Sequence, residues 1–496
     1  MSLSVTYARA QLGVSAPLVT VETHLANGLP AFHIVGLPEA AVRESRDRVR
    51  SALINSHFEF PQRRITVNLA PADLPKEGGR YDLAIAIGIL AASGQVPGEA
   101  LENYEFIGEL ALTGALREVS GSLPAAIASA AAARRLVVPQ GSGGEAALAG
   151  GEIKTAASLL QVCAELHGRE QLPRAVTETA TAPPPCADLA DVRGQLRARR
   201  ALEVAAAGGH NLLFYGPPGT GKTMLASRLP GILPPLGARE LIEVAAVYSS
   251  AGLPRLQQRP FRAPHHSASP TALVGGGSNP KPGEISLAHR GVLFLDEMPE
   301  FPRHALEILR EPLESGEVRI SRARAQVTYP ADFQLVGAMN PCPCGYLGEA
   351  RCRCTPDQID RYRNKLSGPL LDRIDMQVEV ASLSASQLQE APRGESSEAV
   401  RARVSAAREC QLERQGKINA QLQGAELDKF CHLAQSEQAL LRHSVEKLNL
   451  SARSYHRVLK VARTLADLAG EERIGPAQIA EALAYRNLDR RQTAPA

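Results

Sequence analysis

The stretch NLLFYGPPGTGKTMLASRL, residues 211–229, decides how the centre of this chain folds. The apolar run NLLFY is typical of a buried strand, and TMLASRL is typical of a helix. The segment between them, GPPGTGKT, fits the phosphate-binding loop pattern, which needs that strand before it and that helix after it. Glycines let the backbone curl so that its N–H groups face phosphate oxygens, and the helix turns its positive end toward the anion. The stretch therefore predicts a nucleotide site.

A second motif completes this predicted site. Residues 291–297, GVLFLDE, read as a buried strand that ends in two carboxylates. Asp296 is expected to hold Mg²⁺ through water, and Glu297 is expected to orient and polarise the attacking water. In the first motif, Lys222 would reach the β- and γ-phosphates and Thr223 would offer its hydroxyl to Mg²⁺. The predicted cofactors are ATP and Mg²⁺, and the predicted nucleotide-binding residues are Gly216, Pro217, Pro218, Gly219, Thr220, Gly221, Lys222 and Thr223.

The rest of the chain divides by composition and periodicity. A chain of 496 residues is too long for one core, since domains usually run to roughly 100–200 residues. Residues 1–172 alternate β-rich runs with alanine-rich helical stretches, and residues 173–190, with three consecutive prolines, form a linker. In residues 191–381 strands alternate with helical segments, which predicts a parallel sheet, and residues 382–496 are helical throughout. The predicted fold class is therefore α/β with an all-α C-terminal domain.

The overall composition limits the cellular location and the classes of binding partner that we expect. The hydrophobic fraction of 44% and the charged fraction of 22% are those of an ordinary soluble globular protein. No apolar run approaches the roughly 20 residues that cross a bilayer, and the start of the chain lacks the features of a signal peptide. We therefore expect a cytoplasmic protein with no membrane partner. A net charge of +3 is too small to indicate a nucleic-acid binder, so any basic surface must be local.

With these two motifs the sequence resembles the AAA+ ATPases, and further positions match that family. Asn340, at the end of FQLVGAMN, resembles the polar residue that senses the γ-phosphate. Arg373 in SGPLLDRID resembles the arginine finger, which a neighbouring subunit inserts to stabilise the transition state. Arg453 in LSARSYHR resembles the second sensor on the helical lid, with Arg457 as its rival. Since a finger acts on the neighbouring subunit, the resemblance implies a ring.

Two longer segments resemble a particular branch of that family. Residues 259–297 and 309–341 are similar to the magnesium chelatase-like ATPases, and within them to the bacterial YifB/ComM family. This resemblance implies a homo-oligomer, expected to be a hexamer, that acts as an ATP-driven DNA helicase in branch migration during natural transformation. Three alternatives stay open: a remodelling subunit of the magnesium chelatase type, a protein unfoldase, and a scaffolding ring in which ATP only sets assembly.

A basic hairpin is the predicted DNA contact. In EVRISRARAQVTYP, residues 317–330, apolar positions are interleaved with Arg319, Arg322 and Arg324, as in a two-stranded ribbon with a basic tip or face. Several such hairpins around a pore would contact many phosphates without reading sequence. The alternative is a solvated edge strand, where arginines only prevent aggregation.

The N-terminal domain resembles that of Lon protease but lacks its chemistry. The resemblance rests on residues 69–94 and 106–126, in which PKEGG is followed by Arg80 and Tyr81 where the nucleophilic serine would fall. No lysine occurs between Lys76 and Lys154, so the base of the serine–lysine pair is missing too. We expect an inactive peptidase fold that serves assembly, DNA or a partner.

Four of the eight cysteines lie in one short segment, NPCPCGYLGEARCRC. Cys342, Cys344, Cys352 and Cys354 could fill a tetrahedral Zn²⁺ site, although a single residue between the cysteines of each pair gives a tight chelate. Reduced, solvated thiols and a redox switch are the alternatives. A zinc knuckle here would stiffen a subunit interface or a pore-facing projection without touching ATP. The pair His265 and His266 invites a metal or acid–base role, but a histidine pair in a turn with no third ligand nearby is more often structural.

Overall fold

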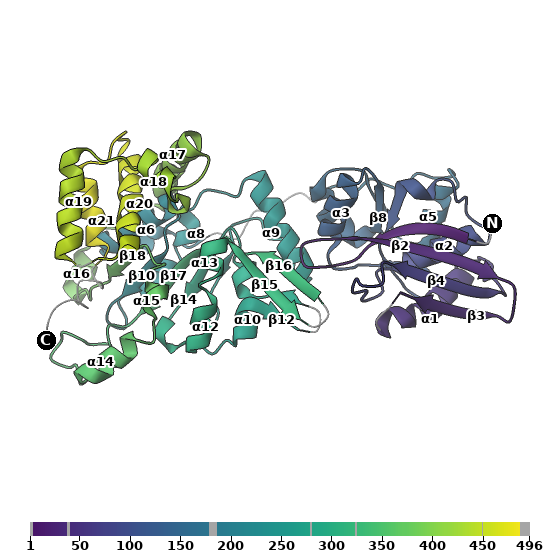
Figure 1. The fold of residues 1–496 in the computed structure, drawn as a ribbon, viewed down its shortest axis with the longest axis horizontal. Helices are drawn as coiled ribbons and strands as arrows, with labels where there is room; N and C mark the ends of the chain where they lie inside the picture. The colour runs from purple at the N-terminus through teal and green to yellow at the C-terminus, as the bar shows by residue number, and fades with distance from the viewer. Residues whose placement is uncertain are drawn as a thin grey trace.

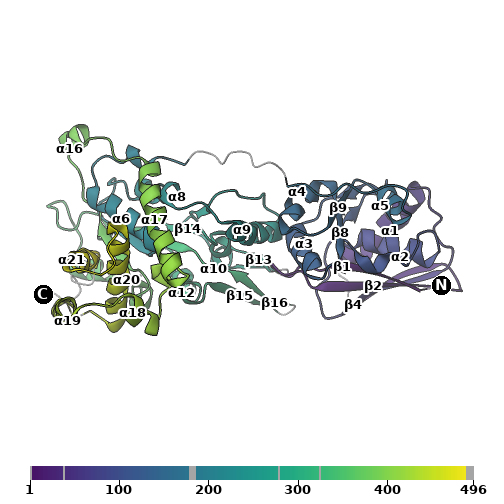
Figure 2. The same cartoon turned by 90° about the horizontal axis from the view of Figure 1, so that it is seen from above.

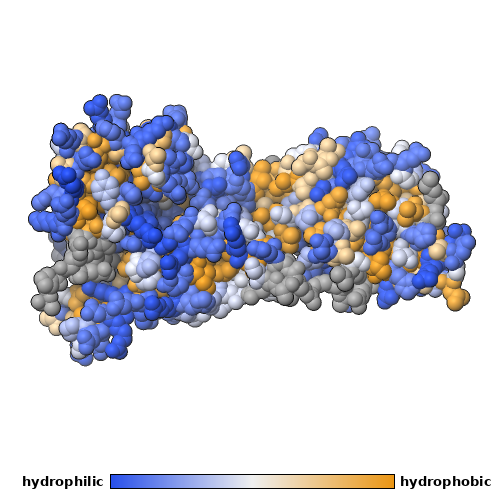
Figure 3. All heavy atoms as spheres, viewed as in Figure 1, coloured by the Kyte–Doolittle hydropathy of each residue, from blue (hydrophilic) through white to orange (hydrophobic). Residues whose placement is uncertain are grey.

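The computed structural model describes residues 3–36, 40–177, 186–277, 280–322, 325–448 and 450–486. Figure 1 shows an elongated molecule, with an N-terminal unit at one end and the C-terminal helices at the other. In the face drawn in Figure 3, hydrophilic residues predominate over the helical end, and hydrophobic patches gather over the N-terminal unit. In this described part of the chain, no helix is both long and apolar enough to cross a membrane.

The N-terminal unit is a mixed α/β structure built on two sheets. One sheet has the order β1-β2-β4-β3, from β1 (Leu3–Arg9), β2 (Leu18–Ala26), β4 (Arg64–Ala70) and β3 (Ala31–Val35). The other is parallel, with the order β5-β8-β9, from β5 (Tyr104–Phe106), β8 (Arg135–Pro139) and β9 (Ile153–Ala156). The helices are α1 (Ala40–Asn55), α2 (Asp82–Ala92), α3 (Ser122–Ala131) and α5 (Leu159–Leu166). Because α2 is apolar all round, it is buried in the core of this unit.

The centre of the molecule is a parallel sheet of five strands. Its order is β11-β14-β17-β10-β18, from β11 (Phe261–Arg262), β14 (Val292–Leu295), β17 (Gln334–Met339), β10 (Leu212–Tyr215) and β18 (Met376–Glu379). Strands of this kind are covered on both faces, which explains their continuous apolar runs. Successive residues face opposite cores: Phe214 packs on one side and Leu213 on the other. The expected α/β class with a parallel sheet is therefore confirmed.

One face of this sheet shares its core with the C-terminal helices. These are α17 (Ser397–Gln415), α18 (Ala425–Phe430), α19 (Gln435–Lys447), α20 (Ala452–Ala469) and α21 (Pro476–Ala484). In Figure 2, α20 and α21 lie beside α6 (Leu196–Gly208), and α6 contacts α17, α20 and β18. A single apolar cluster runs from Phe214 and Val336 of the sheet through Leu202 of α6 to Val404 and Leu465 of the helices. The expected helical C-terminal region is confirmed, and it is packed onto the sheet.

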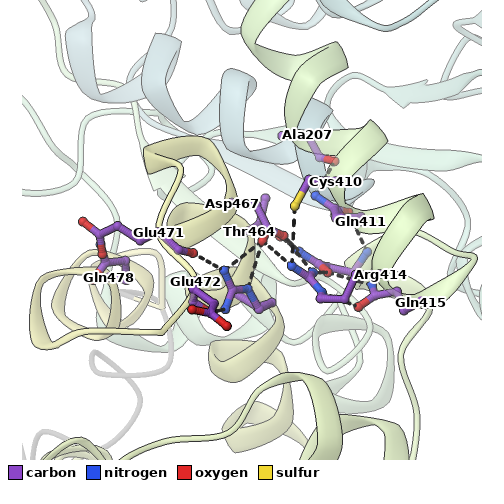
Figure 4. Close-up of polar contacts among 12 residues, drawn as sticks. Ala207, Cys410, Gln411, Arg414, Gln415, Thr464, Asp467, Glu471, Glu472 and Gln478 are labelled. Carbon is purple, nitrogen blue, oxygen red and sulfur yellow. Dashed lines mark hydrogen bonds and ion pairs between the residues drawn. The ribbon is translucent and has the colours of Figure 1, made fainter.

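Buried polar contacts reinforce this junction (Figure 4). The Asp467 carboxylate in α20 is fully buried and accepts hydrogen bonds from Arg414 of α17 at 2.6 Å and from Arg463 at 3.0 Å. The amide of Asn419 donates to the same carboxylate at 2.7 Å, and Gln411 donates to the Ala207 carbonyl at the end of α6. Since buried charges persist only when they are paired, this network fixes how α17, α20 and α6 meet.

The opposite face carries α10 (Pro270–Val274), α11 (Glu284–Leu287), α12 (Arg303–Ile308) and a hairpin of β15 (Glu317–Arg322) and β16 (Ala325–Pro330). Hairpin residues Val318 and Ile320 are buried against this layer, and the Arg319 side chain between them is 60% exposed. The ribbon that the sequence predicted is therefore present. The tip residues 323 and 324 lie outside the described part, and so does the side chain of Arg322.

The N-terminal unit touches this hairpin and one further helix. A tight turn between β1 and β2 places Gly13, with a φ of +62°, so close to β16 that a Cβ there would lie 2.4 Å from a methyl carbon of Val327. Nearby, Gln11 donates to the Ser250 carbonyl at 2.8 Å in α9 (Ala238–Ala251). The two units thus meet at the hairpin and at α9.

Candidate nucleotide site

The loop after β10 holds its lysine in a polar cradle. Lys222 begins α7 (Lys222–Ala226), and its ammonium donates to the carbonyls of Gly216 and Pro217 at 2.8 Å each and to Asn340 Oδ1 at 3.2 Å. Burial lowers the pKa of Lys222, while Asp296 and Glu297 oppose that shift. Phosphate oxygens are stronger partners than these neutral oxygens, so the cradle can exchange them for a bound anion.

Two oxygen ligands converge beside the loop. Thr223 Oγ1 donates to Asp296 Oδ2 at 2.6 Å, because β14 and β10 both run parallel to β17 and bring their carboxyl ends to one edge. Hydroxyl and carboxylate oxygens are the donor types that Mg²⁺ prefers, so these residues fit that cation. Glu297 follows with a φ of 49°, an uncommon conformation for a residue other than glycine. Its side chain is 55% exposed, open to the site.

Asn340 lies where a γ-phosphate sensor is expected. It follows β17, the strand between β14 and β10, and its amide oxygen contacts Lys222. The predicted residues of the phosphate side thus come together at one end of the sheet. The roles predicted for them remain predictions.

The four cysteines form a compact cluster. Sγ–Sγ separations are 3.4 Å for Cys342–Cys344, 3.6 Å for Cys344–Cys352 and 3.9 Å for Cys342–Cys352, and the four sulfurs lie within 4.8 Å of one another. Four ligands at ~2.3 Å from a tetrahedral zinc lie about 3.8 Å apart, so the cluster fits that ion. Backbone N–H groups of Arg353 and Tyr346 lower the pKa of the Cys344 thiol to about 6, which favours the metal-binding thiolate.

This cysteine loop lies closer to the nucleotide site than the sequence indicated. Gly345 adopts a φ of +84°, and a Cβ there would lie 2.7 Å from the ring of Pro218 in the phosphate loop. The chain folds back directly after Asn340, so the cysteine loop lies against the phosphate loop. That a zinc knuckle here would act without touching ATP remains a prediction.

Arg373 and Arg453 lie at the opposite end of the sheet from this loop. β18 pairs with β10 in parallel, Leu212 opposite Met376, and Arg373 precedes the strand. Arg453 Nη1, at the start of α20, is 3.9 Å from Asp372 Oδ2. A recess of about 1050 Å³ opens here, lined in part by Arg373, Arg453 and Arg457. These arginines cluster away from the phosphate loop of their own chain.

The three arginines differ in how firmly they are held. Arg457 pairs with the buried Asp375, and although burial opposes the charge, this contact and His210 hold the pKa of that carboxyl far below its usual range. Arg373 is 7% exposed; burial lowers its pKa, and it contacts Glu314. The Arg453 side chain is 64% exposed and is the freest of the three to meet another molecule.

Sequence reasoning missed the place of His266. Its Nδ1 lies 3.4 Å from Glu297 Oε2, and both residues line a cavity of about 340 Å³ together with Thr223 and Asp296. Only the parallel register of β11 with β14 would have predicted this neighbourhood, and β11 is too short to be recognised from the sequence.

In the N-terminal unit, Arg80 and Tyr81 occupy the position where the resemblance to Lon protease would place a nucleophilic serine. Arg80 is 5% exposed and Tyr81 is fully buried, and burial raises the pKa of Tyr81 to about 12. These side chains contribute to packing at that position.

Comparison with known proteins places these features in a family. Residues 188–388 match the family "Magnesium chelatase, subunit ChlI", residues 21–142 match "Subunit ChlI of Mg-chelatase" and residues 394–486 match "Magnesium chelatase, subunit ChlI C-terminal". The chain is 53% identical to the protein YifB of Salmonella typhimurium over 99% of its length and 98% of that protein's. It is 54% identical to the competence protein ComM of Haemophilus influenzae over the same shares, and 27% identical to the magnesium-chelatase 38 kDa subunit of Cereibacter sphaeroides over 34% of this chain and 54% of that one. The chain therefore belongs to the YifB/ComM family of magnesium chelatase-like AAA+ proteins.

Proposed function

We propose that this protein is an ATP-hydrolysing motor that works as a hexameric ring on DNA and drives branch migration of recombination intermediates. The observation that carries the proposal is the division of one predicted active site between the two ends of the sheet. The phosphate side, with Lys222 and Asp296, lies at the carboxyl ends of the strands, and Arg373 lies at the amino ends. Closed assembly brings the arginine side of one subunit to the phosphate side of the next.

Each residue then has a distinct task in hydrolysis. Lys222 neutralises the β- and γ-phosphates, and Thr223 and Asp296 would hold Mg²⁺, which offsets the negative charge of the phosphates. Glu297 orients and polarises the attacking water and accepts its proton, and Asn340 senses the γ-phosphate. Arg453 and Arg373 of the neighbouring subunit stabilise the charge that develops on the transferred phosphoryl group.

DNA as the partner is supported by the hairpin and by a relative. Arg319 projects from β15 with its aliphatic neighbours buried beneath it, so its guanidinium is presented outward. Six copies around a pore would supply phosphate contacts that do not depend on sequence. The relative from Haemophilus influenzae is named a competence protein. We place the protein in the cytoplasm, where thiols stay reduced.

A second candidate is a remodelling motor of the magnesium chelatase type or a protein unfoldase. The 27% identity to a magnesium-chelatase subunit favours it. Such a motor would share the nucleotide site but would respond to a protein partner and not to DNA.

The experiment that tests the proposal is ATP hydrolysis with and without four-way-junction DNA at two salt concentrations, beside Glu297→Gln. We expect turnover that DNA stimulates, that salt weakens and that the variant loses. Turnover indifferent to DNA would contradict the DNA role and favour the second candidate.

We also propose that the cysteine cluster holds one structural Zn²⁺. Purified protein should contain about one zinc per chain, and Cys342→Ser/Cys344→Ser should lose it. Cys410→Ser is the matched control, since Cys410 is an exposed free cysteine on α17. An unchanged zinc content in the double variant would contradict the proposed zinc site.

A further inference from the structure

Arg373, the predicted arginine finger, is held by contacts within its own chain. Its guanidinium contacts the Glu314 carboxylate, and its Nη1 donates to the Pro369 carbonyl at 2.6 Å. Only 7% of Arg373 is exposed, whereas the Glu314 side chain is 60% exposed. A finger that serves the next subunit has to leave its own chain to meet the γ-phosphate there. In this conformation Arg373 is therefore held back.

Glu314 is the partner that neutralises Arg373. Among the residues that the structure describes, no other carboxylate lies within ion-pair distance of this guanidinium. Burial lowers the pKa of Arg373; Glu314 opposes that shift, and three neighbouring arginines add to it. Those arginines have carboxylates of their own, in the pairs Arg310–Glu307, Arg453–Asp372 and Arg457–Asp375. Because a buried charge persists only when it is paired, Arg373 leaves Glu314 readily only for another anion, such as a phosphate.

The carboxylate that holds the finger lies at the base of the basic hairpin (Figure 1). Glu314 belongs to α13 (Pro312–Ser315), and β15 begins three residues after it. The carbonyl of Gly316, between α13 and β15, accepts a hydrogen bond at 2.7 Å from the N–H of Ala331, directly after β16. Both ends of the hairpin are thus joined to the segment that carries Glu314, so a shift of the hairpin also shifts this carboxylate.

We propose that Glu314 is a positioning residue that holds the arginine finger back until DNA moves the hairpin. Phosphates that bind Arg319 displace β15 and α13 with it, and Arg373 exchanges Glu314 for the γ-phosphate bound to the neighbouring subunit. An arginine finger contributes about 10³–10⁵ to the rate of hydrolysis, so the fraction of released fingers sets the turnover. DNA thereby raises ATP hydrolysis without touching the nucleotide. This inference rests on the proposed function.

The test removes the charge of Glu314 and keeps its size, in Glu314→Gln. We expect kcat for ATP without DNA to rise about 3-fold or more, because a half-exposed ion pair is a modest restraint whose loss shifts a population several-fold. With saturating four-way-junction DNA, kcat should match that of the unaltered protein, so the stimulation by DNA shrinks. Glu314→Asp, which keeps the charge, should retain most of the stimulation. A merely structural role for Glu314 would lower both rates.

A double variant shows whether Glu314 acts through the finger. Glu314→Gln/Arg373→Ala should hydrolyse ATP as slowly as Arg373→Ala alone, with and without DNA. The matched control is Glu311→Gln, which makes the same change at an exposed glutamate three residues earlier in the chain. It should behave as the unaltered protein does.

An unchanged or lower kcat without DNA in Glu314→Gln would overturn the inference. A double variant that turns over faster than Arg373→Ala would overturn it too, since Glu314 would then act by another route. Failure of the proposed function looks different: the unaltered protein would hydrolyse no more ATP than Glu297→Gln, or DNA would not stimulate it, and the inference would fall with the function.

Discussion

Gly345 lets the cysteine loop pack closely against the phosphate loop. At Gly345 a side chain would meet Pro218, and at Gly348, which shares a left-handed φ of +90°, it would meet open space. Gly345→Ala and Gly348→Ala therefore carry similar backbone strain, of the order of 1 kcal/mol, and differ in the clash.

We predict that Gly345→Ala raises KM for ATP several-fold and that Gly348→Ala leaves it nearly unchanged, because only the first displaces the loop that binds phosphate. Steady-state ATP hydrolysis checks this, with zinc content measured on both proteins. Equal KM values would show that the contact with Pro218 does not shape the nucleotide site.

Residues in local motifs were predictable, and those that depend on distant pairing were not. The positions of Lys222, Thr223 and Asp296 were predicted because the phosphate-binding loop and the end of the apolar strand can each be recognised from a few consecutive residues. The neighbourhood of His266 and Glu297 follows from the pairing of β11 with β14, and that of Gly345 and Pro218 follows from a loop that folds back. Neither leaves a periodic trace in the sequence.

Among the elements, α17 and α20 depend on one buried carboxylate. Replacing Asp467 by Ala would leave Arg414 and Arg463 without their shared partner in a dry environment. Breaking a buried pair in this way costs about 3–5 kcal/mol.

We predict a marked fall in the temperature at which the C-terminal helices unfold in Asp467→Ala, measured by calorimetry. Asp191→Ala is the control, since the Asp191 side chain is 51% exposed and its two arginine contacts are long, at 3.9 Å. A shift in the control as large as that in Asp467→Ala would contradict the role given to the network.

The hairpin is the element on which the DNA role depends. We predict that Arg319→Ala weakens binding to junction DNA about equally for all sequences and lowers the salt dependence of binding, because each phosphate contact releases counterions. Binding titrations at several salt concentrations measure both effects. Arg239→Ala, which removes a 93% exposed arginine from α9, should change neither. An unchanged DNA affinity in Arg319→Ala would show that the DNA contact does not involve this hairpin residue.

The elements themselves were largely predictable. Strands β10, β14 and β17 of the parallel sheet and the helical C-terminal region follow from apolar runs and helical periodicity, and β15 and β16 follow from their alternation. The short β11 was not predicted. How the elements dock was not predictable, because the core that α17 and α20 share with the sheet depends on contacts between residues hundreds of positions apart, such as Arg408 with the Ala206 carbonyl.

For the whole molecule, the separation of Arg453 from Lys222 predicts complementation between subunits. Lys222→Ala and Arg453→Ala should each be nearly inactive alone. In a mixed ring, an intact Arg453 from one variant meets an intact phosphate loop from the other at about a quarter of the interfaces.

ATP hydrolysis should therefore reappear when the two proteins are mixed before assembly. The control is to mix either protein with the double variant Glu297→Gln/Arg453→Ala. With Arg453→Ala no subunit carries Arg453, and with Lys222→Ala every phosphate side lacks either Lys222 or Glu297, so neither mixture forms a complete interface. If Arg453 served the loop of its own chain, every mixture would stay as inactive as its parts.

The shared core also bears on where movement can occur. Swinging α17 to α21 away from the sheet would expose Leu202, Val404 and Leu465 to water, and each such side chain costs roughly 1.5–3 kcal/mol to uncover. The N-terminal unit, by contrast, is joined to the sheet region through residues 173–190 and contacts it at the hairpin and at α9. The sheet and the C-terminal helices of one subunit should therefore move as one rigid body during the ATP cycle. The movement that each hydrolysis event produces should then occur at the interfaces between neighbouring subunits.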